Sequence, residues 1–470
     1  MELSRRARIG RALSRVNFGA ILILIPLAAV PYGTVDAWSE ALFESAVFGL
    51  TILWIVDGWI TRSIWVKPHR LLFPLFALVT LALLQSLPVW NSPGGPALAG
   101  ISLSRAASLD PFETWRFALK LLAIALTLGL LLRYVSSLSR LRILAYVVIG
   151  VALASALLGF LVTELPQVAS GLTGNRLKPG QSYAQFENRN HFAFLMEMAI
   201  GLVMGLAFGR RPLGKRFVLC ALAGLALLGS VLLTHSRGGV LSLAAETLFF
   251  FLLFSSYRFV SVDSHGRQAG FRQRSFGRAM SRLVLAGLLL AVVCGSVMVI
   301  GGNETINRLE ATPAEFTARD AAPLKTLRPQ IWRATLSMIS DNPFLGVGFA
   351  AYSVAVPRYL KASGEHALNQ AHNDYLELLA SGGVVGGILG AWFLALFVKD
   401  VRNQRQPDRD QWALKCGALA GLFAVAVHSL FDFGLHITIN ALVCLTLIVV
   451  AVKIPGDDPS ASPQPSFASA

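Results

Sequence analysis

Long apolar stretches recur through the whole of this chain and limit its possible folds more than any other feature. An α-helix needs about 20 mostly apolar residues to cross the hydrocarbon core of a bilayer. The stretches that meet or approach this length are residues 16–34, 41–58, 71–90, 116–133, 142–163, 191–209, 217–234, 239–257, 283–301, 381–398, 412–430 and 436–453. The sequence therefore predicts an all-α polytopic membrane protein with about twelve transmembrane helices.

The shortage of charge excludes a soluble protein. Charged residues make up 14% of the 470 residues and apolar residues 54%, whereas a soluble domain carries roughly 25% charged residues. The net charge of +15 would suggest a nucleic-acid partner in a soluble protein. In a membrane protein, Lys and Arg collect in cytoplasmic loops and face lipid head groups. We therefore expect membrane lipids as partners and no nucleic acid.

The distribution of Lys and Arg predicts the orientation of the chain. With a cytoplasmic N-terminus, 27 of the 41 Lys and Arg residues fall in inner segments and 12 in outer segments. This asymmetry follows the positive-inside rule for an inner-membrane protein with both termini in the cytoplasm.

The same assignment predicts the domain organisation. We expect a single transmembrane domain over residues 1–454, with a large periplasmic loop at 302–380 that contains short helices, such as one near residues 331–340. Residues 455–470 are rich in Pro and Ser and are expected to form a disordered cytoplasmic tail.

Polar residues on the expected outer side are the candidates for function, because ionisable groups at a membrane are costly. Arg237 lies in a short outer link and is followed by two glycines, which allow a ligand or another backbone to come close. The alternative is an Arg that reaches from a helix end to the surface. Arg328 precedes the predicted loop helix, and the alternative there is an ordinary surface Arg.

His372 stands directly before Asn373 and Asp374, at the start of an apolar span. Histidine changes its charge near neutral pH, which suits a general base. The alternative is that Asn373 or Asp374 caps a helix and His372 is merely adjacent.

Two further polar groups lie on the same side. Residues 188–191 stand at the mouth of the sixth span, and His428, Asp432 and His436 surround the last outer turn. The second group could form a metal site, but a polar network that closes a helical hairpin is the favoured interpretation.

Arg237, Arg328 and His372 together suggest a chemistry. Arginines bind phosphate through a planar, permanently charged guanidinium group. Two arginines and a histidine on one face of the membrane therefore suit attack on a lipid-linked diphosphate.

Taken in order, these motifs resemble the O-antigen ligase/polymerase family of bacterial envelope glycosyltransferases. The resemblance covers about residues 185–400. The matching pieces are residues 188–193, 236–239, Arg328 with Trp332, residues 342–348, and residues 372–376 with Gly382 and Gly383.

The resemblance implies a C-type glycosyltransferase-like membrane fold and a periplasmic reaction. A glycan is transferred from undecaprenyl diphosphate to the lipid A core by ligases, or to a second lipid-linked glycan by polymerases of O-antigen or exopolysaccharide repeats. The reaction is expected to be inverting and to need no metal or other cofactor. Nothing in the sequence separates ligase from polymerase.

The resemblance also implies roles for particular residues. His372 would be the base, and Arg237 and Arg328 would hold the diphosphate. The substrate-binding candidates are Arg189, Asn190, Trp332, Asn373 and Asp374. The expected outer segments carry no acidic DxD pair, which is coherent with arginines in place of a metal. The rival hypotheses are a transporter or flippase of a polyprenyl-linked or anionic substrate and a non-catalytic scaffold.

Overall fold

The computed structural model describes residues 2–62, 69–88, 106–165, 182–209, 214–255, 328–360, 368–403 and 409–453. Apart from an isolated bridge between Tyr183 and Phe186, the regular structure of these residues is helical. The helices are α1 (Glu2–Ala29), α2 (Ala37–Thr61), α3 (Leu72–Ser86), α4 (Pro111–Tyr134), α5 (Leu138–Glu164), α7 (Arg189–Gly209), α8 (Lys215–Leu233), α9 (Arg237–Ser255), α12 (Arg328–Asp341), α13 (Tyr352–Ala355), η3 (Val356–Arg358), α14 (Asp374–Arg402), α15 (Arg409–His428), η4 (Gly434–His436) and α16 (Thr438–Val452).

The multi-pass architecture is confirmed. Within the described ranges, nine helices are long and apolar enough to cross a membrane, and α3 and α16 are shorter apolar helices. These helices coincide with all of the expected spans except 283–301, which lies outside the described residues. The tail at 455–470 and parts of the segment 302–380 lie outside them as well. The helix expected near residues 331–340 is present as α12.

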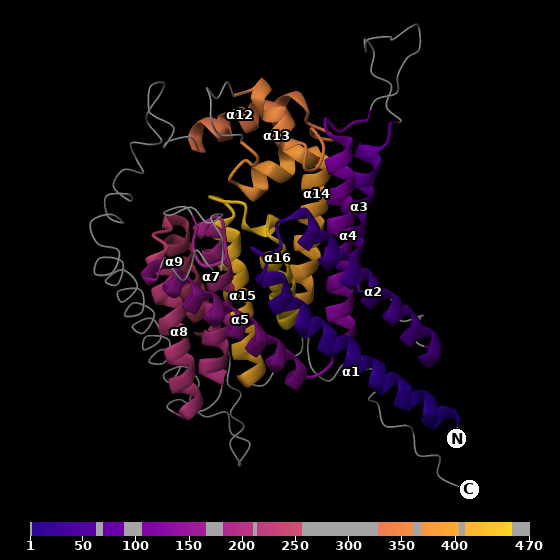
Figure 1. The fold of residues 1–470 in the computed structure, drawn as a ribbon, viewed down its shortest axis with the longest axis vertical. Helices are drawn as coiled ribbons and strands as arrows, with labels where there is room; N and C mark the ends of the chain where they lie inside the picture. The colour runs from indigo at the N-terminus through magenta and orange to yellow at the C-terminus, as the bar shows by residue number, and fades with distance from the viewer. Residues whose placement is uncertain are drawn as a thin grey trace, which may run out of the picture.

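The helices form two packed groups (Figure 1). In the first, α7 is the most deeply buried candidate span and packs against α5, α8, α9 and α15. Glycines let α7 and α15 touch through their backbones, since a Cβ added at Gly417 would lie 2.2 Å from the carbonyl oxygen of Gly201. Such small-residue contacts are typical of membrane helices. In the second group, α3 packs against α4 and α14.

Helix α14 is interrupted at Gly383, whose φ of 62° and ψ of −164° are not helical. Residues 342–349, which follow α12, fill the interruption and pair with the backbone on both sides of it. The hydrogen bonds run from Val347 N to Ala380 O (2.8 Å), Gly348 N to Ser381 O (3.1 Å), Val384 N to Pro343 O (2.8 Å) and Val385 N to Phe344 O (3.2 Å). Backbone groups freed by the interruption are thus satisfied, as an apolar environment requires.

The buried side chain of Gln85, near the end of α3, joins the same arrangement. Its Nε2 donates to the carbonyl oxygens of Leu345 (2.6 Å) and Ser381 (2.9 Å), and its Oε1 accepts from the N–H of Phe349 (3.2 Å). We call Gln85, residues 342–349 and Gly383 the Gln85 clamp. The clamp fixes the end of α12 against α14. Helix α12 begins at Arg328, and α14 begins two residues after His372.

Candidate functional site

The candidate residues from the sequence gather at one end of the bundle. They lie at the starts of α7, α9, α12 and α14 and in the turn after α15. This end carries α12 and α13, whereas α1 begins at the opposite end (Figure 1). Segments far apart in the sequence therefore meet on one face.

Asp432 is the centre of this meeting point. It lies between α15 and α16, and its side chain is fully buried. Nδ1 of His372 lies 3.2 Å from Oδ1 of Asp432, and Nη2 of Arg328 lies 3.5 Å from Oδ2. Nδ2 of Asn190 donates to Oδ2, and Nε2 of His191 lies 3.9 Å from Oδ1. We call Asp432, His372, Arg328, Asn190 and His191 the Asp432 network.

The backbone around His372 is fastened to the turn that carries Asp432. Nδ2 of Asn373 donates to the carbonyl oxygen of Leu430 (3.0 Å), and the N–H of Asp374 donates to that of Ser429 (3.0 Å). His372 itself has a φ of 49°, in the left-handed region that non-glycine residues seldom occupy. Such a conformation persists where the surrounding contacts over-determine it and is common at functional sites.

Arg237 reaches the network through its neighbour in the chain. The hydroxyl of Ser236 donates to Oδ1 of Asn190 (2.8 Å), whose amide nitrogen binds Asp432. Arg237 follows as the first residue of α9 and is partly exposed. His235, on its other side, has a φ of 52°, so a tight turn delivers Arg237 to this end of the bundle.

The other predicted site residues lie beside the network in the chain. Arg189 is the first residue of α7, and Trp332 is the fifth residue of α12. Oδ1 of Asn373 accepts two N–H groups from the first turn of α14, so Asn373 is the cap of this helix. Oδ2 of Asp374 accepts from the hydroxyl of Ser429 (2.7 Å). Substrate-binding roles for these residues stay predictions.

The ionisation of the Asp432 carboxyl group is determined by the side chains around it. Burial alone raises the pKa of the Asp432 carboxyl, but the hydrogen bond from His372 and the charges of His191, His372 and Arg328 lower that pKa far below its usual range. Asp432 is therefore ionised at neutral pH. Since a carboxylate can only accept hydrogen bonds, Nδ1 of His372 carries the proton between them. In the neutral imidazole, Nε2 of His372 is then the nitrogen with a free lone pair.

The three residues of the last outer turn go to different environments. Asp432 joins the network, His428 pairs with Glu197 inside the bundle (2.8 Å), and His436 lies 3.6 Å from Asp374. Burial, followed by the charges of Lys120 and His191, lowers the pKa of His436 to about 3. In the described part of the chain, no three His, Cys, Asp or Glu side chains are grouped so that they could hold a metal ion.

Sequence reasoning did not assign Asp432 or His191 to the site. The available signal was charge, since Asp432 is the charged residue of the expected outer turn 431–435 and faces a side of the membrane with two candidate arginines. The partners of Asp432 could not be read from the sequence, because they come from elements 60 to 242 residues away.

Comparison with known proteins found one family match. Residues 221–391 match the family model described as O-antigen ligase, and the match runs from within α8 into α14. It contains Arg237, Arg328 and His372, whereas Asn190 and Asp432 lie outside it. A search of curated proteins found no matching relative.

Proposed function

We propose that the chain is a polyprenyl-linked glycan transferase of the O-antigen ligase family, whose model matches residues 221–391, and that the Asp432 network is its reaction centre. In the proposed reaction a glycan moves from undecaprenyl diphosphate to the hydroxyl of an acceptor, which is the lipid A core or a second lipid-linked glycan. One observation carries the proposal: a fully buried carboxylate joins His372 and Arg328, which come from separate segments of the chain.

His372 is the proposed general base. Asp432 holds the proton on Nδ1, so Nε2 is free to accept the proton of the acceptor hydroxyl while that oxygen attacks the anomeric carbon. A carboxylate that orients a histidine and stabilises its cationic form works in the same way in hydrolytic triads. Side chain exposure of 31% at His372 leaves the imidazole open to an acceptor.

Arg328 and Arg237 are the proposed binding groups for the diphosphate. Departure of the diphosphate places charge on oxygen, and preorganised guanidinium groups stabilise that charge. Arg328 makes a long 3.5 Å contact to Asp432, and its side chain is 35% exposed, so most of its five donors stay available. Attack opposite to the leaving diphosphate inverts the anomeric carbon, and two arginines supply positive charge without a metal.

We propose that this end of the bundle faces the periplasm. The asymmetry of Lys and Arg supports that orientation, as does the start of α1 at the other end of the bundle (Figure 1). Cysteines introduced at exposed Ser337 on α12 and exposed Asn403 after α14 test it in sealed cells. An impermeant thiol reagent that labels position 403 and not position 337 would reverse the orientation.

The decisive experiment is transfer by the purified full-length protein. It is given an undecaprenyl-diphosphate glycan together with lipid A core or a second lipid-linked glycan, and the products are separated by mass. We expect a new glycosidic product with one of the two acceptors, which also distinguishes ligase from polymerase. Movement of the donor between leaflets without a glycosidic bond would favour a transporter instead.

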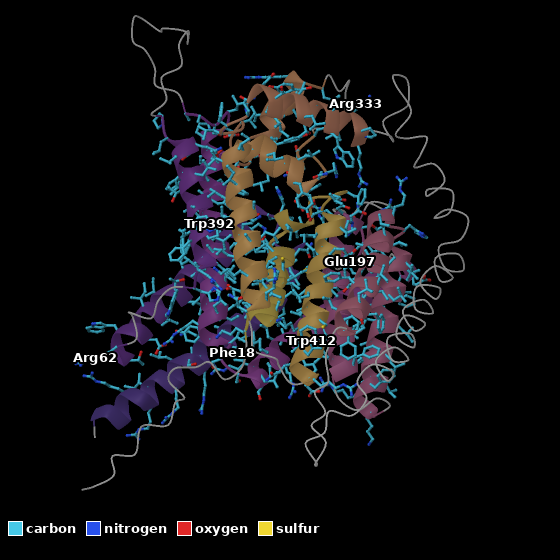
Figure 2. The ribbon with its side chains drawn as sticks, turned by 180° about the vertical axis from the view of Figure 1, so that it is seen from behind. Phe18, Arg62, Glu197, Arg333, Trp392 and Trp412 are labelled. Carbon is cyan, nitrogen blue, oxygen red and sulfur yellow. The ribbon has the colours of Figure 1, made fainter. Side chains whose placement is uncertain are left out.

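Variants assign the residues. We expect His372→Ala and Arg237→Ala to lose transfer by at least about 100-fold while they insert into the membrane normally. The matched controls are His69→Ala and Arg333→Ala. His69 lies before α3, and Arg333 is exposed on α12 (Figure 2). Both should keep their activity. Full activity in His372→Ala and Arg237→Ala would refute the assignment.

A further inference from the structure

A second cluster of ionisable side chains lies inside the bundle, below the Asp432 network. It consists of Glu197 on α7, Glu246 on α9 and His428 at the end of α15, and all three are fully buried. Glu246 follows Arg237 by nine residues, which is about 14 Å along a helix, or half of a bilayer's hydrocarbon core. Figure 2 shows Glu197 within the bundle, between the levels of Arg333 and Trp412.

Most polar atoms of this cluster have no hydrogen-bond partner among the described residues. Nδ1 of His428 lies 2.8 Å from Oε1 of Glu197, and its ring stacks on Phe194 at 4.1 Å. The other atoms are unpaired: both carboxyl oxygens of Glu246, Oε2 of Glu197 and Nε2 of His428. A purely structural polar network would satisfy its members, because an unsatisfied buried polar group destabilises the fold.

The charges of the cluster do not balance. His428 can neutralise one carboxylate, and Glu197 takes that place. The charged neighbour that acts on Glu246 is Glu197, which is itself acidic. On its other side Glu246 meets the glycine contact between α7 and α15, where a Cβ added at Gly201 would lie 2.7 Å from Oε1 of Glu246. An ionised and unpaired carboxyl group in such a place takes up a proton rather than stay charged.

We propose that Glu246 is a proton-binding site inside the membrane-spanning bundle, beside the hydrogen-bonded pair of Glu197 and His428. The titratable groups that face it are Glu197 from α7 and His428 from α15. The site also touches the helix of Arg237, because a Cβ added at Gly238 would lie 2.7 Å from Nε2 of His428. The inference stands whether or not the chain transfers a glycan.

Dicyclohexylcarbodiimide tests the proposal on the full-length protein in lipid nanodiscs. This apolar reagent enters the membrane and takes the proton of a neutral carboxyl group onto its nitrogen, while the carboxylate oxygen bonds to its carbon. We expect peptide mapping by mass spectrometry to find the adduct on Glu246 at neutral pH, and we expect the adduct to disappear at alkaline pH. The mapping uses the wild type, so it does not depend on the folding of a variant.

The substitution Glu246→Gln should lower the labelling of this peptide at least tenfold. Glu113→Gln, at a half-exposed residue in the first turn of α4, should leave it unchanged. Labelling on Glu197 in place of Glu246 would overturn the proposal. Failure to label at neutral pH would overturn it as well. Protection of Glu246 by sodium at constant pH would show that the site takes an alkali cation instead.

Discussion

The Asp432 network and the Gln85 clamp both hold distant segments of the chain together, but they use different chemical groups. Both join segments that are far apart in the sequence, and both involve α14 or the residues directly before it. The network uses charged and polar side chains that converge on one carboxylate. The clamp uses backbone amides, a neutral side chain and a glycine. The first arrangement leaves reactive groups open to a ligand. The second pairs both ends of the Gln85 amide and the backbone on either side of Gly383.

The two regions also differ in how far their side chains are exposed to a ligand. His372 and Arg328 keep about a third of their side chains exposed, whereas Gln85 is 1% exposed. Charged groups that are only partly satisfied are suited to a substrate. Neutral groups that are fully satisfied are suited to rigidity. Damage to the network should therefore lower activity, and damage to the clamp should lower stability.

The largest effect is expected from Asp432→Asn. The amide keeps the size of the side chain, but it no longer carries the charge that holds a proton on Nδ1 of His372 and stabilises the imidazolium form. We expect kcat for glycan transfer to fall by about 10² to 10⁴. The measurement is product formation by protein normalised to its folded fraction.

The matched control is Asp400→Asn. Asp400 is also a buried carboxylate bound to an arginine, Arg70, but it stands near the other end of α14. The activity of Asp400→Asn per folded molecule should equal that of the wild type. If Asp432→Asn retained more than a tenth of the wild-type kcat, Asp432 would not orient the base.

The next effect is a loss of stability from Gly383→Ala. The backbone of Gly383 lies in a region that only glycine occupies readily, and a Cβ there would lie 2.2 Å from the carbonyl oxygen of Phe344. We expect the free energy of unfolding to fall by at least about 2 kcal/mol, measured as a lower midpoint of thermal unfolding in detergent.

The control for this effect lies one turn further along α14. At Gly386 an added Cβ would meet nothing closer than the carbonyl oxygen of Leu378, at 3.6 Å, and Gly386 is not among the glycines with positive φ. Gly386→Ala should therefore leave the midpoint nearly unchanged. Equal midpoints for the two variants would show that the interruption of α14 does not depend on glycine.

The sequence predicted the helices well and the site only in part. Apolar length sets the position of a membrane span, which is why the stretch at 142–163 agrees with α5 (Leu138–Glu164). The motif residues His372, Arg328 and Asn190 were singled out, and the structure brings them together. Asp432 was noted only as part of a polar network at the last outer turn and was not assigned to the site, because its role depends on partners from distant segments that no local pattern encodes.

The interruption of α14 and the buried acidic cluster could not be predicted from the sequence for the same reason. The glycines at 382 and 383 suggested close packing, but they did not show that the loop after α12 would enter α14 at that point. Glu197 and Glu246 fall inside apolar runs, and their common environment is created by the crossing of three helices. In each case the determining contact is a tertiary one between distant residues.

The smallest effect is expected from His436→Gln, at the edge of the Asp432 network. His436 lies 3.6 Å from Asp374 and 3.7 Å from Glu377, and its pKa is lowered from about 6.5 to about 3.

The lowered pKa of His436 makes the stability depend on pH. Well above pH 6.5 the imidazole is neutral in both the folded and unfolded states, so it adds no pH dependence. As pH falls below 6.5 the unfolded chain binds a proton that the folded protein does not, so the wild type loses stability. Glutamine does not titrate, so the thermal midpoint of the wild type should decrease relative to that of His436→Gln between pH 7.5 and pH 5. A midpoint difference that is the same at both pH values would mean that His436 is equally protonated in the folded and unfolded states, and that its surroundings do not lower its pKa.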